Sequence, residues 1–386
     1  MIKIGNIADI HLQGGFESKE AVALLKAGEI FRERNVDLVI VGGDVFEDVS
    51  TEEQRLVFKK FLEDFFAYTP ILIIRGNHDK PRELTLYHQN KVLGNVFVSE
   101  KPEIFDFYIG SQEEHVKFLT LPHFSAGALA LQSGSVDQLG EKGTNAFMDL
   151  LDSYYQEIQK SDCPCFVAFH GTISGAKLDN EKIPRQNGIH LPLPLLESFG
   201  CPVVGGHYHK LQNVGGKVWY PGSITRQTWG EHKDDKGILI WSCNEGKWDA
   251  EPEFISLNPE PMISISATWD GSKFIGETGE EINLESISDS KAKLRFRFNV
   301  DKELTHTVPK NLKEILSSID PSAKIEKTTN TKMAVRNSEI ATTNDIEESL
   351  RIYFQGKGMS DSDIDAHLAE RRLIVESAEI KEEVAA

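Results

Sequence analysis

Residues 70–79 read Pro-Ile-Leu-Ile-Ile-Arg-Gly-Asn-His-Asp, and this stretch decides how the whole chain is interpreted. An apolar run without alternation is typical of a strand that is buried on both of its faces. The run leads directly into Gly76, Asn77, His78 and Asp79, a flexible glycine followed by three polar side chains. Ligands of α/β sheets bind beyond the carboxyl ends of the strands, so we expect a functional site here.

The same arrangement of an apolar strand followed by metal-binding residue types recurs at four other places. They are Asp9-Ile10-His11 after residues 2–8, Gly43-Asp44 after residues 37–42, His170-Gly171 after residues 166–169, and His207-Tyr208-His209 after residues 202–206. A single Asp-x-His triplet arises by chance in many chains, whereas five placements at strand ends are a specific signal. The sequence therefore predicts one metal site that is assembled from five loops.

Helical patterns separate the first three predicted strands. Residues 19–34 and 52–67 carry apolar side chains near helical spacing, which predicts one helix in each range. Strands that alternate with helices predict an α/β fold with right-handed crossovers and largely parallel pairing.

The pattern changes near residue 258. Residues 263–267 and 293–298 alternate apolar with polar side chains, as half-exposed strands do, and a helix at 309–318 and a short strand at 323–325 follow. We predict four segments: a catalytic domain at residues 1–258, a small α+β domain at 259–328, a linker rich in Thr, Asn and Ser at 329–343, and a helical tail at 344–379.

The tail is predicted to form two amphipathic helices, at about residues 344–355 and 361–377. Ile346, Leu350, Tyr353 and Phe354 recur at helical spacing in the first. An exposed amphipathic pair is typical of an element that binds a partner. The alternative is that the two helices pack on each other or on the small domain.

Composition limits the partners and the compartment. The net charge is −18, whereas contacts to DNA phosphates come from Lys and Arg. The substrate is therefore small, or basic residues cluster locally, or a partner protein provides the contacts to DNA. The four cysteines are scattered without the spacing of a zinc site, as expected for free thiols in the cytoplasm. No segment has the pattern of a signal peptide or a membrane span.

The set of candidate ligands suits a site that binds two divalent ions. Two ions about 4 Å apart can acidify a bridging water and hold the phosphate oxygens during hydrolysis of a phosphodiester. Asp44 is the best candidate for a carboxylate that bridges both ions, and Asp9 and His11 follow one strand end and can bind the same ion. Asn77 offers a neutral oxygen, and the mixed oxygen and nitrogen set, completed by His170, His207 and His209, suits Mn, Fe or Zn.

His78 neighbours a ligand but need not be one. Its imidazole can stabilise the transition state or protonate the leaving oxygen. Asp79 is expected to orient His78 or to fix the loop. Among the other histidines, His123 and His190 remain candidates for positions near the site, because each is expected in a loop of the catalytic domain.

These motifs resemble those of the calcineurin-like metallophosphoesterases, and within them those of the Mre11/SbcD nucleases. Residues 8–12, 41–46, 74–79, 170–176 and 205–209 resemble the five motifs of that family in order, and Tyr220-Pro221-Gly222-Ser223 resembles a turn that closes its nuclease domain. The motifs cover about residues 1–240. The segment between His11 and Asp44 is several residues shorter than is usual in the family.

The resemblance implies a metallophosphoesterase β-sandwich flanked by helices, a capping domain at residues 259–328 and a helical tail. It implies a Mn-dependent DNA nuclease, with 3′→5′ activity on duplex ends and endonuclease activity on single strands or hairpins. It also implies a homodimer through the nuclease domain, and a tail that binds the coiled coil of a Rad50/SbcC-like ATPase. One ion would be bound by Asp9, His11, Asp44 and His209, and the other by Asp44, Asn77, His170 and His207.

Two rival interpretations remain. A small-molecule phosphatase or phosphodiesterase could use the same metals, although it would need neither the capping domain nor the tail. A scaffold without activity would not need the intact set of ligand positions and His78.

Overall fold

The structure is a computed structural model of the chain, and it describes residues 1–65, 69–88, 95–123, 139–177, 190–287, 292–330 and 346–371. The chain divides into two compact units. One comprises residues 1–266, 283–297 and 310–326, and the other comprises residues 267–282, 298–309 and 327–386.

Two sheets form the centre of the first unit. One sheet has the order β14-β13-β1-β2-β3-β4, with β15 also paired to β13. Its strands are β1 (Ile2–Ile7), β2 (Leu38–Val41), β3 (Ile71–Ile74), β4 (Val96–Ser99), β13 (Gly237–Asn244), β14 (Lys247–Trp248) and β15 (Glu253–Ser256).

The other sheet has the order β11-β12-β10-β7-β6-β5. Its strands are β5 (Glu103–Ile109), β6 (Glu114–Leu121), β7 (Cys165–His170), β10 (Val203–Gly206), β11 (Gln212–Gly215) and β12 (Val218–Tyr220). A separate pair is formed by β8 (Thr172–Ile173) and β9 (His190–Leu191).

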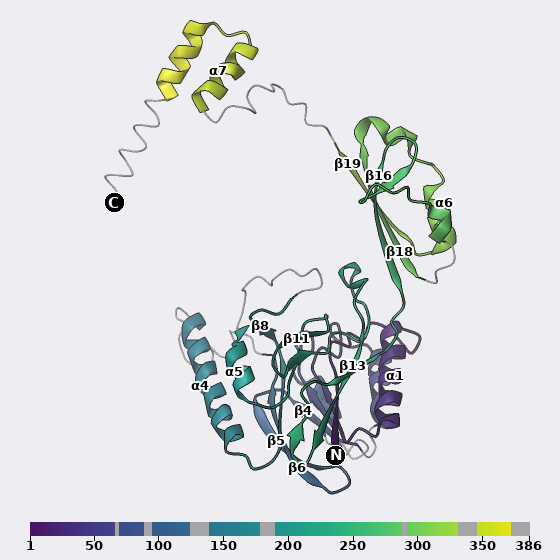
Figure 1. Cartoon of the computed structure of the whole chain (residues 1–386), viewed down its shortest axis with the longest axis vertical. Helices are drawn as coiled ribbons and strands as arrows, with labels where there is room; N and C mark the ends of the chain where they lie inside the picture. The colour runs from purple at the N-terminus through teal and green to yellow at the C-terminus, as the bar shows by residue number, and fades with distance from the viewer. Residues whose placement is uncertain are drawn as a thin grey trace. The chain divides into compact units, whose positions relative to one another are not determined.

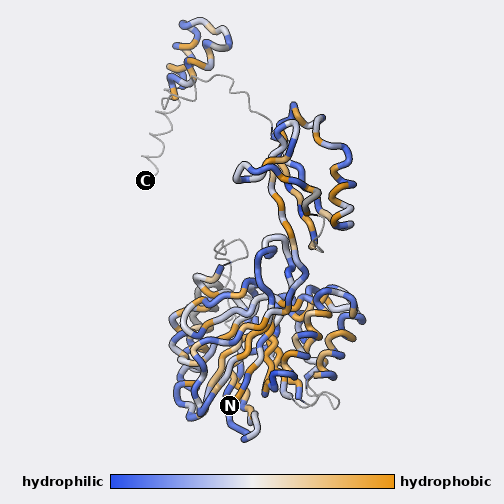
Figure 2. The backbone as a smooth tube through the Cα atoms, turned by 45° about the vertical axis from the view of Figure 1, so that its right-hand side comes forward, coloured by the Kyte–Doolittle hydropathy of each residue, from blue (hydrophilic) through white to orange (hydrophobic). Residues whose placement is uncertain are grey.

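Helices cover the outer faces of the two sheets (Figure 1). α1 (Lys19–Glu33) and α2 (Glu52–Phe65) pack on one side, and α4 (Leu139–Gln159) and α5 (Leu193–Ser198) pack on the other. Short 3₁₀ turns are η1 (Leu84–Tyr87) and η2 (Trp229–Glu231). Hydrophobic stretches run through the central strands in Figure 2.

Alternate side chains of one strand enter different cores, which explains the apolar runs. Leu38 and Ile40 of β2 pack between the two sheets, whereas Val39 and Val41 pack under α1 and α2. A strand with a helix layer on one face and a second sheet on the other has no polar face. The predicted α/β sandwich flanked by helices is confirmed.

Parallel pairing is confirmed for β1 to β4 and for β6, β7, β10 and β12. The remaining strands, β5, β11 and β13 to β15, pair antiparallel, so pairing is less uniformly parallel than predicted. Most of these strands follow one another through short connections, which permit antiparallel but not parallel pairing.

The chain beyond residue 261 forms a four-stranded sheet in the order β17-β16-β18-β19. Its elements are β16 (Met262–Trp269), β17 (Phe274–Gly276), β18 (Lys293–Asp301), β19 (Lys324–Asn330), α6 (Leu312–Ile319), η3 (Leu284–Ile287) and η4 (Lys302–Thr307). Alternate residues of β18 are buried, as the sequence pattern predicts. The boundaries of the capping domain stay a prediction, and most of the proposed linker lies outside the described residues.

The tail contains α7 (Ile346–Gly356) and a second helical stretch at residues 361–371. The two pack on each other, as one of the alternatives predicts: Phe354 stacks on His367, and Arg351 bonds to Asp365. Ile364 and Leu368 are fully or almost fully buried. The predicted helical residues beyond 371 lie outside the described part of the chain.

All four cysteines are free thiols, and three of them are buried. Within the described residues, no helix is both long enough and apolar enough to span a membrane.

Candidate metal centre

The structure brings the predicted ligands together at one edge of the sandwich, where the parallel strands of both sheets have their carboxyl ends. Parallel strands β1, β2 and β3 lead into Asp9 and His11, Asp44, and Asn77. Neighbouring strands β7 and β10 of the other sheet lead into His170, His207 and His209. Residues that lie far apart in the sequence therefore converge, because parallel strands end at the same edge of a sheet.

Glycine allows the two sheets to approach each other at this edge. A side chain at Gly206 would collide with the carbonyl of Gly42, and one at Gly76 would collide with the Asp44 carboxylate. The close approach lets Nδ1 of His170 donate to the carbonyl oxygen of Gly42 at 2.7 Å.

Four of the predicted ligands have a left-handed backbone, which non-glycine residues rarely adopt. The φ angles are 52° at Asp9, 49° at His11, 53° at Asp44 and 110° at His207. Such conformations persist where surrounding bonds hold them, and they gather at functional sites. Here the backbone N–H groups of Asp9 and His11 donate to the carbonyls of Gly43 and Asp44, and that of His207 donates to the Asp9 carboxylate at 2.8 Å.

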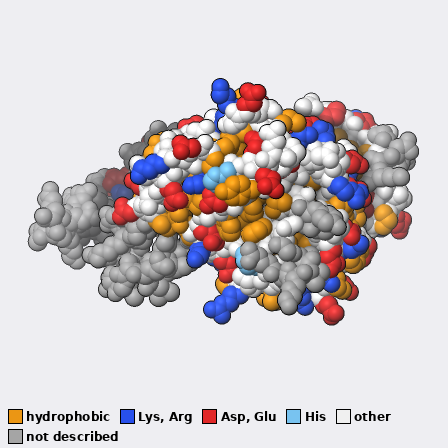
Figure 3. Space-filling model, turned by 90° about the horizontal axis from the view of Figure 1, so that it is seen from below, with side chains coloured by type: hydrophobic (Ala, Val, Ile, Leu, Met, Phe, Trp, Pro, Cys, Tyr) orange, Lys and Arg blue, Asp and Glu red, His pale blue; other side chains and the backbone are white. Residues whose placement is uncertain are grey.

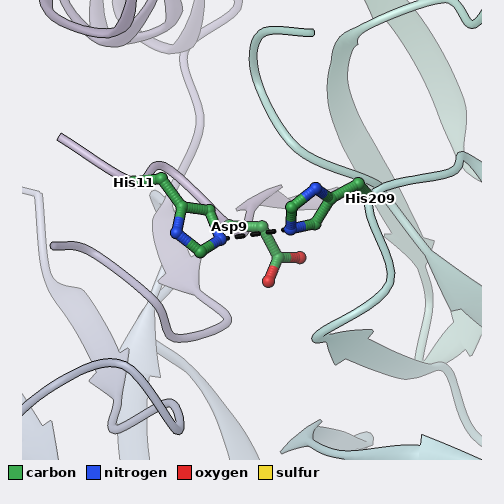
Figure 4. Close-up of side chains that lie close together, drawn as sticks. All are labelled: Asp9, His11 and His209. Carbon is green, nitrogen blue, oxygen red and sulfur yellow. Dashed lines mark hydrogen bonds between the residues drawn. The ribbon is translucent and has the colours of Figure 1, made fainter. Parts of the chain in front are cut away.

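Asp9, His11 and His209 form the first ligand group (Figure 4). One potential ligand atom from each lies within 4.8 Å of the others. Nε2 of His11 lies 3.1 Å from Nε2 of His209, and Figure 4 shows the two rings turned toward each other beside the Asp9 carboxylate. Acidic groups lie beside the Nδ1 atom of both rings, which favours a proton on Nδ1 and leaves the two Nε2 lone pairs facing one another. Such an arrangement fits a cation between the two rings.

Asp44, His170 and His207 form the second ligand group, with Asn77 beside them. Oδ1 of Asn77 lies 2.9 Å from Nε2 of His170 and 2.8 Å from Nδ1 of His207. An amide oxygen, a carboxylate and two imidazoles form a mixed donor set of the kind that binds Mn, Fe or Zn.

Asp44 lies between the two groups. Its Oδ2 is 3.8 Å from Nε2 of His11 and 3.4 Å from Nε2 of His170. One carboxylate oxygen of Asp44 therefore lies near a predicted ligand of each group.

His78 lies at the edge of the first group. Its ring meets the His11 ring edge-on at 4.9 Å, and its Nδ1 is 2.8 Å from the carbonyl oxygen of Glu47. A carbonyl can only accept, so Nδ1 carries a proton. One ring nitrogen of His78 also lies within 4.8 Å of potential ligand atoms of His11 and Asp44.

Asp79 fixes the loops, one of the two roles that the sequence left open. Its carboxylate accepts hydrogen bonds from the backbone N–H groups of Asp44, Val45, Phe46 and Gly76, at 2.9 to 3.2 Å. Burial and the neighbouring charge of Asp44 raise the pKa of Asp79 to about 6.

Two carboxylates that the sequence analysis missed lie behind the first group. Oε2 of Glu47 is 2.7 Å from Nδ1 of His11, and Oε1 of Glu231 is 3.2 Å from Nδ1 of His209. Both belong to segments without a motif; the one available signal for Glu47 was its place three residues after Asp44.

Of the two further histidine candidates, His123 lies beside the second group and His190 lies in β9. The His123 ring is 6.2 Å from the His170 ring, and burial together with the charges of His170 and Arg75 lowers the pKa of His123 to about 4. His190 pairs with Thr172 in the two-stranded sheet.

Asp44 and His170 together favour a positive charge in the second group. Burial disfavours ionisation of Asp44, but the neighbouring His170 outweighs this effect and lowers the pKa of Asp44. Burial also disfavours a charged His170, but Asp44 and Asp9 outweigh it and raise the pKa of His170 to about 9. A divalent cation would supply this positive charge more effectively than a protonated imidazole.

Residues 2–211 match the family described as calcineurin-like phosphoesterase. The chain belongs to this family. Members are metallophosphoesterases, enzymes that use divalent metals, and the clusters described above can hold such ions. In this metallophosphoesterase, the candidate ligands from the five sequence motifs thus lie together in one site.

The chain is also 23% identical over 300 residues to the SbcD subunit of the nuclease SbcCD from Bacillus subtilis (strain 168), a match that covers 69% of this chain and 72% of that protein. Two solved structures have lower similarity. GAP50, the anchor in the inner membrane complex of Plasmodium, has a TM-score of 0.45 and 14% identity over 67% of this chain and 85% of that one. A dimetal phosphatase from Danio rerio has a TM-score of 0.38 and 13% identity over 67% and 99%.

Replacement of Asp44 by Ala is expected to remove both ions and abolish hydrolysis, because both ligand groups lose a shared carboxylate. Elemental analysis of protein dialysed against Mn²⁺ measures this directly. Asp48→Ala is the control, since Asp48 is an exposed carboxylate four residues away that pairs with Lys80. Two ions per chain in Asp44→Ala would refute the bridging role.

Proposed function

We propose that this chain is the nuclease component of a DNA end-processing complex that acts in repair and recombination. It would hydrolyse DNA phosphodiesters with two divalent ions, preferably Mn²⁺. The proposed reactions are 3′→5′ degradation of duplex ends and endonucleolytic cleavage of single strands or hairpins. The observation that carries the proposal is the convergence of seven predicted ligands and His78 in a chain that is also similar to the SbcD subunit of a nuclease.

The proposed ligand sets share Asp44. Asp9, His11 and His209 would complete the set for one ion, and Asn77, His170 and His207 would complete the set for the other. Two ions held in this way would supply a hydroxide nucleophile at neutral pH and neutralise charge on the phosphate. Asp79 and the backbone contacts of Asp9 would keep the ligand loops rigid during the reaction.

His78 would act on the reacting phosphate rather than on the ions. With Nδ1 donating to the carbonyl of Glu47, the imidazolium form of His78 would carry a second proton on Nε2, which it would donate to the leaving oxygen or share with a phosphate oxygen. The fixed orientation of the ring suits that role, because the direction of the free nitrogen is set before substrate arrives.

The C-terminal helices and three exposed apolar side chains support the proposed partners. The Bacillus subtilis relative is, by its name, one subunit of a larger nuclease, and we propose that residues 344–379 bind an SbcC/Rad50-like ATPase. For the proposed homodimer, the nuclease domain exposes Val49, Leu56 and Leu86 on two segments that a Ser50–Glu83 hydrogen bond joins.

The alternative function is hydrolysis of a small phosphodiester or phosphomonoester at the same site. The acidic composition favours this alternative, since the net charge is −18. On the face drawn in Figure 3, Lys and Arg side chains are interspersed with Asp and Glu around an apolar area, and they form no continuous basic patch among the residues described there.

End-labelled duplex, hairpin and single-stranded DNA, assayed with and without Mn²⁺, separate the two functions. We expect Mn²⁺-dependent cleavage of DNA, with duplex degradation increased by the ATPase and ATP. A chromogenic phosphodiester is assayed in parallel. Hydrolysis of that compound with no cleavage of any DNA, even in the presence of the ATPase, would support the small-molecule enzyme instead.

His78→Ala is expected to keep both ions and to lower turnover by ~100-fold or more, the usual contribution of a proton-transfer group. Metal content and single-turnover cleavage are measured on the same preparation. His115→Ala is the control, because His115 contacts Asp106 on the β5–β6 hairpin and is not one of the predicted ligands. Loss of metal from His78→Ala would make His78 a ligand.

Truncation after residue 330 is expected to spare Mn²⁺-dependent cleavage of single strands and to abolish both binding to the ATPase and ATP-stimulated duplex degradation. A full-length variant tests the surface itself: Ile346→Glu with Tyr353→Glu changes two side chains that are 62% and 46% exposed. Glu370→Ala, an exposed position on the second helix, is the control. Unchanged affinity of the truncated protein for the ATPase would disprove the proposed docking.

A further inference from the structure

A buried ion pair lies directly behind His209. Glu231 ends η2, and Lys236 immediately precedes β13. Both side chains have no exposed surface, and Nζ of Lys236 is 2.6 Å from Oε2 of Glu231. Neither residue belongs to the proposed ligand sets, and the motifs of the sequence include neither.

Every polar group of this pair has a partner. Nζ of Lys236 also donates to the carbonyl oxygen of His209 at 2.6 Å and to Oγ of Ser223 at 3.0 Å, so its three protons are used. Glu231 accepts the backbone N–H groups of Gln227 and Thr228 at 3.2 and 3.1 Å. Removing two charges from water is unfavourable, and a hydrophobic pair often gives equal or greater stability. The pair therefore calls for a role other than stability.

The two charges hold His209 at two points. Glu231 accepts a hydrogen bond from Nδ1 of His209 at 3.2 Å, and Lys236 donates a hydrogen bond to the backbone carbonyl of His209. A proton fixed on Nδ1 leaves the Nε2 lone pair directed at His11 and Asp9. Ser223 adds a third contact, because its backbone N–H donates to the His209 carbonyl at 3.2 Å.

We infer that Glu231 and Lys236 are positioning residues that set the tautomer and direction of His209, and thereby the affinity of the Asp9, His11 and His209 group for its ion. The inference rests on the proposed metal centre and names the residues that tune one half of it. Mutation of a carboxylate that accepts a hydrogen bond from a metal-binding histidine commonly lowers metal affinity by about 10- to 100-fold.

The effect should be confined to one ion. In the second group, Nδ1 of His170 bonds to the neutral carbonyl of Gly42, which takes the place that a carboxylate has in the first group. In the first group, the other carboxylate, Glu47, has 47% of its side chain exposed, so solvent screens its charge. Glu231 is therefore the stronger of the two influences on the first group.

The test compares full-length wild type with Glu231→Gln and with Glu231→Gln/Lys236→Met. Glutamine keeps the shape of the side chain and one of the two oxygens that accept backbone N–H groups. The double variant avoids an unpaired buried ammonium. Glu20→Gln is the matched control, because Glu20 is a buried carboxylate that pairs with Lys19 on α1 and is not one of the predicted ligands. Each protein is stripped with a chelator and then titrated with Co²⁺ and with Mn²⁺.

We expect wild type and Glu20→Gln to bind two ions per chain. In both Glu231 variants, one ion should bind about 10- to 100-fold more weakly, and the other should bind as in wild type. The visible absorption of bound Co²⁺ should change for the weakened ion alone. Thermal unfolding of the stripped proteins separates a loss of stability from a loss of metal affinity.

Three results would overturn the inference. They are unchanged affinity for both ions in the Glu231 variants, equal weakening of both ions, and weakening of the same size in Glu20→Gln. A wild-type chain that binds no divalent ion would instead refute the proposed metal centre, so the two failures are distinguishable.

Discussion

The buried carboxylate of Asp79 is the constraint on which the rest of the site depends. It accepts four backbone N–H groups from two loops, three following β2 and one following β3. These bonds offset the loss of hydration on burial, and they hold the loop in which Asp44 adopts its left-handed backbone. Ligands supplied by separate strands can keep one geometry only when the loops between them cannot move independently.

The two ligand groups are held in different ways. The second group is fixed by the backbone, because His170 is the last residue of β7 and bonds to the carbonyl of Gly42 in the facing sheet. The first group has side-chain contacts in addition to its backbone bonds, since His11 and His209 lie on loops beyond their strands and their rings lie beside Glu47 and Glu231.

The positions of the ligands were predictable from the sequence because each ligand follows an apolar strand. Neighbouring parallel strands end at the same edge of a sheet, so residues that follow them lie close together. Glu231 and Lys236 were not predictable from local sequence. Their partners, Ser223 and His209, come from other loops, so the contacts arise only after the second sheet and β13 have assembled. The same limit applies to the antiparallel edge strands, which follow no motif.

The acidic composition constrains how such a site could meet DNA. Sequence-independent affinity for DNA grows with the number of phosphates that Lys and Arg neutralise, and this chain has 60 acidic against 42 basic residues. Two divalent ions would bring four positive charges to the centre and reverse the local sign, although their field is screened within about 8 Å at physiological salt. The centre could therefore orient one phosphate but not hold an extended duplex. If the proposed nuclease function holds, a second, more basic surface would have to retain the DNA, and the proposed partner would then be part of the active machinery.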